Sequence, residues 1–466
     1  MTPSRRDFLL GTLGAAGAAA LGGGLTQTSG AAPIASSGRP GPLPSPGASG
    51  IEHVVVVMME NRSFDHFLGW LPGANGKQAG LSYADPSGKL VPTWHADVKN
   101  GCSFTDPDHS YDGARIQYDG GRMNGFLTDT ANDVYAVSYY GAEDRPFMSQ
   151  LALNYTSCDN YFCSILGPTY PNRFFQHAAA TDRLSNTSTT STLPTIWDRL
   201  NQPGGPTGRY YFSDVPFLAL WGAKYIPISG HYLEFLADAS RGTLPNVSFI
   251  DPRFEDEGDG TSNDDHPLAD IRAGDSLLSE IFHALASGPA WDKTVLVVNY
   301  DEWGGFFDHV APPRVTPGVP VGASPSSGID QDLVNGKVLA GFRVPGIVAS
   351  PFTKGSPSKP RLSHRMFDHT SVLKLIEWRW GLKPLTARDA SNAPGDPQNL
   401  VSAFDFAKPD AGVPDLPVLA PFVPESCTAG NPPIGGSPMS TPTPATSAEG
   451  DGWTSLLSSD LMKGWT

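Results

Sequence analysis

The chain has 466 residues and a formal net charge of −15, with 32 Lys and Arg against 47 Asp and Glu. This acidic balance argues against nucleic-acid binding and against docking on strongly anionic membranes, although it allows transient contact with a zwitterionic lipid surface. The 51 Gly and 44 Pro predict long ordered loops between short helices and strands.

The amino terminus is typical of a twin-arginine export signal. Arg5 and Arg6 precede a weakly apolar stretch of Leu, Ala and Gly, which is too short and too rich in Gly for a stable membrane span. We expect residues 1–32 to be a signal peptide and residues 33–50 a flexible Pro/Gly/Ser leader. The twin-arginine machinery would then export the protein to the periplasm, the cell wall or the extracellular space. No later apolar run approaches the roughly 20 residues of a spanning helix.

Residues 54–59, Val-Val-Val-Val-Met-Met, predict a strand buried on both faces, because the apolar run has no polar alternation. Glu60 and Asn61 follow at once, and Ser63 then offers an N-cap for a following helix. Ligands of open α/β sheets bind just beyond the carboxyl ends of the strands. The carboxylate and the amide therefore indicate either a site for a hard or borderline cation or only the start of a helix.

Strands and helices alternate through the second half of the chain. The residues predict strands over 246–250, 293–300 and 344–350, and amphipathic helices over 271–285 and 371–380. Strands separated by helices predict an α/β fold, with a central, mostly parallel sheet and helices on both faces. We expect one domain over residues 51–425, with long loop insertions around its site. The Pro, Ser, Thr and Gly content of residues 426–466 predicts a largely disordered tail.

The four cysteines match no zinc-binding pattern. Because exported proteins are exposed to an oxidising environment, we expect one or two disulfides among Cys102, Cys158, Cys163 and Cys427. Cys158 and Cys163 are close enough in sequence to pair locally, but the sequence leaves all three connectivities open.

Asp301 and Glu302 form a second pair of polar residues directly after a predicted buried strand. Adjacent carboxylates at a dry site raise each other's pKa unless a cation neutralises them. Together with Glu60 and Asn61 they could supply the ligands of one divalent cation, for which Zn²⁺ and Ca²⁺ are both candidates. The alternative is a solvated acidic turn.

Two further segments contain residues suited to catalysis. Pro168 and Pro171 stiffen the chain around a single hydroxyl, Thr169, although Gly-Pro pairs also mark ordinary turns. His266 lies in an Asp-Asp-His-Pro loop just before the predicted helix at 271–285, and His109 lies in an Asp-Pro-Asp-His-Ser loop. Both histidines are candidates for proton transfer.

Residues 60–66, Glu-Asn-Arg-Ser-Phe-Asp-His, resemble the signature of a bacterial phosphoesterase family that holds phospholipases C and acid phosphatases, within the alkaline phosphatase superfamily. The resemblance continues at intervals to about Leu382, and includes a Tyr-Asp-Glu block that ends in Gly-Phe-Phe-Asp-His at residues 300–309. It implies an alkaline-phosphatase-like fold and the hydrolysis of phosphoesters.

The resemblance also implies roles for individual residues. Thr169 would be the nucleophile that forms a phospho-threonine, and His266 would protonate the leaving oxygen. One divalent cation would be held by Glu60, Asn61, Thr169, Asp301 and Glu302. Phosphate oxygens would be held by Asn61, Asn172 and Arg173, with His109 at the mouth of the site. Alkaline phosphatases proper bind two zinc ions mainly through Asp and His, and the Glu-Asn pair departs from that pattern.

The choice of substrate rests on finer features. The segments at 167–173 and 300–310 look closer to the phospholipase C branch than to the acid phosphatase branch, which predicts phosphatidylcholine-type diesters as substrates and phosphomonoesters as the alternative. The aromatic residues near the motifs form either a cage for a quaternary ammonium group or part of the core; they are Tyr170, Tyr300, Trp303, Phe306 and Phe307. A protein that captures phosphate or lipid without turnover is the alternative from another class.

Overall fold

The structure is a computed structural model, and it describes residues 43–427 except 256, 331, 391–395 and 397, together with residues 453, 456 and 459–465. The predicted signal peptide, residues 1–32, and residues 33–42 of the predicted leader lie outside the described residues. Among the residues described, no helix has the length and apolar character needed to cross a bilayer.

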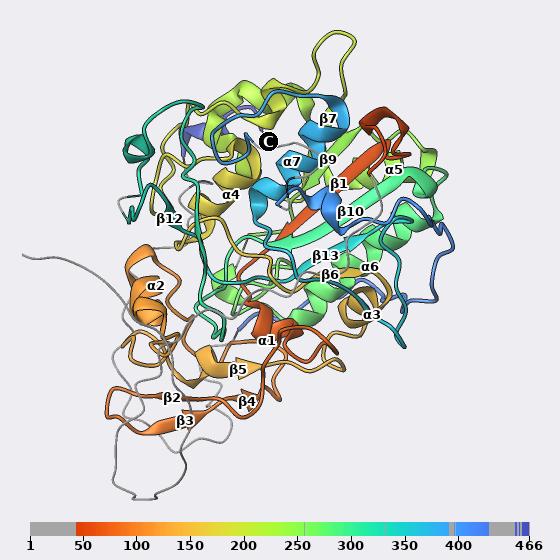
Figure 1. Cartoon of the computed structure of the whole chain (residues 1–466). Helices are drawn as coiled ribbons and strands as arrows, with labels where there is room; N and C mark the ends of the chain where they lie inside the picture. Colours follow the sequence, from red (N-terminus) through yellow and green to blue (C-terminus); the bar gives the residue numbers. More distant parts are fainter. Residues whose placement is uncertain are drawn as a thin grey trace, which may run out of the picture. The chain divides into compact units, whose positions relative to one another are not determined.

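An eight-stranded sheet, in the order β14-β6-β13-β10-β1-β9-β7-β8, forms the centre of the domain (Figure 1). Its strands are β1 (His53–Met59), β6 (Thr156–Cys158), β7 (Gly208–Phe212), β8 (Ser229–His231), β9 (Val247–Ile250), β10 (Thr294–Tyr300), β13 (Gly346–Ala349) and β14 (Arg361–Ser363). The five strands from β10 to β8 are parallel. β13 is antiparallel to both of its neighbours, and β6 pairs in parallel with β14. The predicted mostly parallel sheet is therefore confirmed.

The register of β1 and β10 determines where the polar residues after them lie. Every residue of β10 is buried, as is every residue of β1 except His53, which explains the uninterrupted apolar runs. The two strands pair in parallel from His53 with Thr294 to Met59 with Tyr300. The residues that follow Met59 and Tyr300 therefore leave the sheet side by side.

Helices cover both faces of the sheet, as predicted. They are α1 (Phe64–Leu68), α2 (Tyr111–Tyr118), α3 (Pro146–Asn154), α4 (Thr169–Ala178), α5 (Tyr232–Arg241), α6 (Ile271–Ser287) and α7 (His369–Trp380). α4 packs against α7, whereas α3 and α5 pack against α6, and Figure 1 shows the two groups on opposite faces. The predicted helices at 271–285 and 371–380 correspond to α6 and α7. Ser63 caps α1, because its hydroxyl accepts a hydrogen bond from the backbone N–H of His66.

Three two-stranded sheets lie in the long loops. They consist of β2 (Ser82–Ala84) with β3 (Leu90–Pro92), β4 (Trp94–His95) with β5 (Ser138–Tyr139), and β11 (Arg314–Val315) with β12 (Val338–Leu339). The first two, with α2, belong to the long insertion between α1 and α3 (Figure 1).

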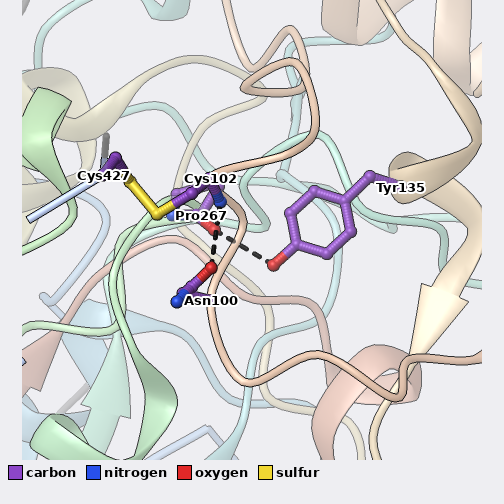
Figure 2. Close-up of a disulfide and its surroundings, with 5 residues drawn as sticks. All are labelled: Asn100, Cys102, Tyr135, Pro267 and Cys427. Carbon is purple, nitrogen blue, oxygen red and sulfur yellow. Dashed lines mark hydrogen bonds between the residues drawn. A yellow bond between two sulfur atoms is a disulfide. The ribbon is translucent and has the colours of Figure 1, made fainter. Parts of the chain in front are cut away.

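One disulfide is present among the described residues, and it joins Cys102 to Cys427 across 325 residues of sequence. Cys158 and Cys163, the locally spaced pair, are free and buried. The thiol of Cys163 instead lies 3.6 Å from the carbonyl oxygen of Ile165. The disulfide lies beside Pro267, as Figure 2 shows.

Most of the tail predicted to be disordered, residues 426–466, lies outside the described residues, and the few described residues pack against the domain. Trp453, Leu456, Met462 and Trp465 are all buried. The short helix η10 (Asp460–Met462) packs against η5 (Phe217–Ile228), and the indole N–H of Trp465 donates to the carbonyl oxygen of Gly222 at 3.2 Å.

Candidate active site

The two polar pairs after β1 and β10 meet at one edge of the sheet. The backbone N–H of Asp301 donates to the carbonyl oxygen of Met59 at 3.1 Å, and the side-chain amide of Asn61 donates to Glu302. Glu60, Asn61, Asp301 and Glu302 are all fully buried. A glycine is required at 304, because a Cβ there would lie 2.1 Å from the carbonyl oxygen of Asn61.

Thr169 lies at the same edge, as the first residue of α4. Its hydroxyl accepts a hydrogen bond from the Asn61 amide at 3.3 Å. The preceding loop is held by Asn172, whose amide oxygen accepts from the N–H of Ile165 and whose amide nitrogen donates to the carbonyl oxygen of Gly167 at 2.7 Å. Asn172 therefore positions the loop that carries Thr169, and the phosphate contact that the family resemblance implied for it stays a prediction.

Arg173 binds the acidic residues around it. Its guanidinium contacts Glu60 at 2.9 Å, Asp301 at 3.3 Å and Asp251 at 3.3 Å, and it donates to the carbonyl oxygen of Met58 at 3.2 Å. Arg173 thus links the ends of β1 and β10, a role that the predicted phosphate clamp did not include. Asp251, at the end of β9, is a site residue that sequence reasoning missed, although it too directly follows a buried strand.

The acidic cluster has more negative charge than its neighbours neutralise. Burial raises the pKa of Glu60 and Asp301, and Arg173 opposes both shifts. Burial also raises the pKa of Glu302, which the charge of His109 opposes and that of Asp301 reinforces. Buried carboxylates of this kind retain their protons unless a cation takes their place.

The residues present fit a divalent cation. The side-chain oxygen of Asn61 is buried and accepts no hydrogen bond, although it lies among carboxylates. With Thr169, Asp301 and Glu302 it forms a set of oxygen donors, which hard and borderline cations prefer. A cation at this edge would be held by these four residues, with Glu60 alongside.

Acidic and histidine side chains also gather in four clusters, within the part of the chain that the structure describes, that could hold a metal ion. They are Asp106-His109-His266, Glu60-Glu257-Asp264, Asp65-Asp308-His309 and His95-Glu143-Asp144. The first two adjoin the strand ends. Glu60 therefore groups with Glu257 and Asp264, two residues that the predicted ligand set did not contain, while Arg173 contacts both Glu60 and Asp301.

The two candidate histidines differ in charge. The Nε2 atom of His109 lies 3.9 Å from Glu302, and that of His266 lies 3.8 Å from Asp106. Burial opposes the charge of His109, but Glu302 and Asp106 outweigh it and raise its pKa to about 10. Burial and the neighbouring His109 and Arg62 charges hold the pKa of His266 well below its usual value. These opposite shifts favour the proton on His109 over His266, whereas the family resemblance implied proton donation by His266.

The loop that carries His266 is held from three directions. Arg62 donates to the carbonyl oxygen of His266 at 3.1 Å, and the hydroxyl of Tyr135 donates to that of Pro267 at 3.0 Å (Figure 2). The Cys102–Cys427 disulfide lies on the third side of the loop. It packs closely there, since a Cβ added at Gly260 would lie 2.7 Å from the sulfur of Cys427. The spacing of the cysteines gave no indication of this arrangement.

The aromatic residues near the motifs belong to the core. Tyr170, Tyr300, Trp303, Phe306 and Phe307 all have an exposed fraction of 0%. The indole of Trp303, for example, donates to Gln117 at 2.7 Å. The interpretation of these five residues as an open cage for a quaternary ammonium group is therefore wrong.

Comparison with known proteins identifies the family. The model of the Phosphoesterase family matches residues 51–214 and 222–383. The chain belongs to this family. It is accordingly a hydrolase that acts on phosphoester bonds, and the family resemblance inferred from residues 60–66 is confirmed.

Several relatives carry the name phospholipase C. The chain is 32% identical over 445 residues to phospholipase C B of Mycobacterium tuberculosis, covering 78% of this chain and 80% of the relative. It is 31% identical over 473 residues to phospholipase C A of the same species, covering 87% and 86%. Non-specific phospholipase C1 of Arabidopsis thaliana is 34% identical over 382 residues, covering 73% and 69%.

Solved structures give weaker matches. The phosphonate monoester hydrolase of Agrobacterium radiobacter is 10% identical, with a TM-score of 0.37 and coverage of 77% of this chain and 78% of the other. A protein of the alkaline phosphatase superfamily from Vibrio parahaemolyticus is 11% identical, with a TM-score of 0.33 and coverage of 73% and 69%. These scores are too low to add to the description of the fold.

The cation site yields a prediction. Asp301→Asn and Glu302→Gln should each weaken the binding of Zn²⁺ or Ca²⁺ by about tenfold or more, because each removes an anionic ligand. Metal content after dialysis, by elemental analysis, and the dissociation constant, by calorimetry, would measure the effect. Asp238→Asn is the matched control and should bind as the native chain does, because Asp238 pairs with Arg209 at 3.1 Å and belongs to none of the four clusters. Equal metal content in all variants would show that the ligands are assigned wrongly.

Proposed function

We propose that the chain is an exported phospholipase C that hydrolyses phosphatidylcholine-type diesters through a phospho-threonine at Thr169. One observation carries the proposal: the hydroxyl of Thr169 lies 3.3 Å from Asn61, at the start of α4 and beside the strand-end carboxylates. The start of a helix favours the negative charge of a phosphate. The relatives named phospholipase C support the substrate class.

Hydrolysis would proceed in two displacements at phosphorus, the first by Thr169 and the second by water. Thr169, after its hydroxyl has released a proton to water, forms a bond to phosphorus as the bond to the glycerol oxygen breaks, and His109 gives its proton to that leaving oxygen. Water then attacks phosphorus from the position that diacylglycerol has left, neutral His109 takes its proton, and phosphocholine leaves Thr169. A divalent cation held by Asn61, Asp301 and Glu302 would supply positive charge to the phosphate and lower the pKa of the Thr169 hydroxyl.

The electrostatics of the site favour a diester over a monoester. A phosphomonoester has one more negative charge to neutralise, yet the guanidinium of Arg173 already contacts three carboxylates. His109 adds one positive charge, which Glu302 and Asp106 partly offset. A singly charged diester is the better match to this limited positive charge.

Export is proposed on two features. Arg5 and Arg6 precede the weakly apolar amino-terminal stretch. The Cys102–Cys427 disulfide is typical of proteins that function in an oxidising compartment, outside the cytoplasm.

Thr169→Ala should lower kcat by about a thousandfold or more, because no other group can form the phosphoryl bond in its place. Ser164→Ala is the matched control, since Ser164 is a buried hydroxyl in the same loop, and it should change kcat by less than about threefold. Mass spectrometry of acid-quenched native enzyme should detect phosphocholine on the peptide that contains Thr169. Near-native turnover by Thr169→Ala would remove this residue from the mechanism.

The role of His109 can be tested by the leaving group. His109→Gln should lose about a hundredfold or more in activity on phosphatidylcholine, whose glycerol oxygen needs a proton to leave. It should lose far less on p-nitrophenylphosphorylcholine, because p-nitrophenolate leaves without a proton. His266→Gln is the matched variant and should affect both substrates equally. The opposite pattern would return the proton donor to His266, as the sequence suggested.

The bond that is broken distinguishes the two kinds of phosphoesterase. Phosphatidylcholine vesicles incubated with the enzyme should yield diacylglycerol and phosphocholine, measured by mass spectrometry, and p-nitrophenyl phosphate should be turned over at least about tenfold more slowly than p-nitrophenylphosphorylcholine. Faster turnover of the monoester, with no diacylglycerol formed, would instead indicate an acid phosphatase.

A further inference from the structure

The tail brings one aromatic side chain to the active site. Trp453 has an exposed fraction of 2%, and its ring stacks on Phe254 with the ring centres 3.9 Å apart and an angle of 4° between the planes. The ring centres of Tyr170 and Phe217 lie 5.3 Å and 6.1 Å away. Tyr170 directly follows the proposed nucleophile, so Trp453 packs next to the start of α4.

Trp453 also contacts the charged pair that links the strand ends. Its indole N–H lies 3.5 Å from Oε2 of Glu60, whereas Arg173 donates to Oε1 of the same carboxylate at 3.0 Å. The guanidinium carbon of Arg173 lies 4.6 Å from the ring centre of Phe254 and 5.6 Å from that of Trp453. Both oxygens of Glu60 therefore face a donor, and Arg173 lies against two stacked rings.

The tail is anchored on both sides of Trp453. Cys427, before it in the sequence, is fixed to Cys102 by the disulfide. After it, Leu456 is fully buried, and Trp465 donates to the carbonyl oxygen of Gly222 at 3.2 Å. Because the tail is attached to the domain before and after Trp453, the indole has a high effective concentration near Glu60.

We propose that Trp453 is a positioning residue of the active site, which holds Glu60 and Arg173 in the orientation needed for cation binding and phosphoester hydrolysis. This inference rests on the function proposed above.

Trp453 forms an inner wall of the site and does not cover its mouth. The side chains of His109 and His266 are 16% and 11% exposed, whereas that of Glu60 is 1% exposed. The site thus meets solvent on the side of the two histidines. Trp453 instead contacts the buried side chains of Arg173 and Phe254.

Loss of the indole should act through its neighbours. Without the ring, Oε2 of Glu60 loses a donor, and Arg173 loses one of the two rings that it lies against. Residues that orient metal ligands typically change metal affinity by about 10–100-fold when they are removed. Because the 3.5 Å contact to Glu60 is long for a hydrogen bond, packing of the ring should contribute more than the N–H.

The experiment compares Trp453→Ala and Trp453→Phe with Trp465→Phe in the full chain. Trp465→Phe removes an indole N–H from the same tail but leaves the contacts of Glu60 unchanged. The dissociation constants of Zn²⁺ and Ca²⁺ would be measured by calorimetry, and kcat and KM with p-nitrophenylphosphorylcholine. Thermal unfolding would report the stability of each variant.

Trp453→Ala should bind the cation about 10–100-fold more weakly and lower kcat at least about tenfold, with KM within about twofold of native. Trp453→Phe should recover most of both losses, and Trp465→Phe should match the native chain. A lower melting temperature for Trp453→Ala, with native cation affinity and native kcat, would show a purely structural role and overturn the proposal. A gain in activity in Trp453→Ala would also overturn it, because the indole would then obstruct the site.

The two readouts separate this proposal from the proposed function. If the native chain binds a cation but does not hydrolyse the diester, the function fails and the cation affinities still decide the role of Trp453. If the native chain hydrolyses the diester but binds no cation, the kcat and KM values of the variants decide the role of Trp453. A native chain that does neither would rule out the site, and with it the role of Trp453.

Discussion

The burial of several carboxylates at the ends of parallel strands is the constraint on which the rest of the site depends. Glu60 and Asp301 leave the sheet side by side because Met59 pairs with Tyr300 in the register of β1 and β10. An unpaired charge in the interior is costly, so each carboxylate needs a partner. Arg173 contacts Glu60 and Asp301, and His109 faces Glu302 at 3.9 Å. The same lack of positive charge that makes the cluster costly makes it suitable for a divalent cation.

Arg62 shows how the first motif determines the position of a distant loop. It donates to the carbonyl oxygens of Asp265 at 2.6 Å and His266 at 3.1 Å, and its guanidinium carbon lies 4.8 Å from the ring centre of Phe306. Asp265 has a φ of 79°, an uncommon value for a residue other than glycine. The contacts with Arg62 hold the backbone of the loop at this conformation, at Asp265 and at His266.

Sequence patterns predicted the features that depend on neighbours along the chain. The apolar run before Glu60, the strand before Asp301 and the cap at Ser63 are local, and each is present in the structure. The composition of the tail also gave a local prediction, which concerns mostly residues outside those described; Trp453 and Trp465, which are described, are buried.

Features that depend on three-dimensional neighbours were not predictable. The partner of Cys102 lies 325 residues away, and nothing in the spacing of the cysteines identifies it. The charge of His109 depends on Glu302 and Asp106, which reach it from separate segments. Arg173 was predicted to bind phosphate for the same reason. The sequence does not show that its guanidinium faces carboxylates at the ends of three strands.

The raised carboxyl pKa values also connect the site to the stability of the fold. Burial raises the pKa of Asp251 to about 6 against the opposing charge of Arg173, and burial raises that of Asp264 to about 7. In the unfolded chain both groups titrate near pH 4. Between about pH 4 and these raised values the folded state holds protons that the unfolded state has released, so the contribution of these groups to stability falls as the pH rises. Burial also raises the pKa of Asp301 and Glu302, the proposed ligands. A cation that replaces the protons of these two carboxylates binds only the folded arrangement of ligands, and it therefore offsets the loss increasingly as the pH rises. Cation binding and the stability of the strand ends are in this way two consequences of the same buried negative charge.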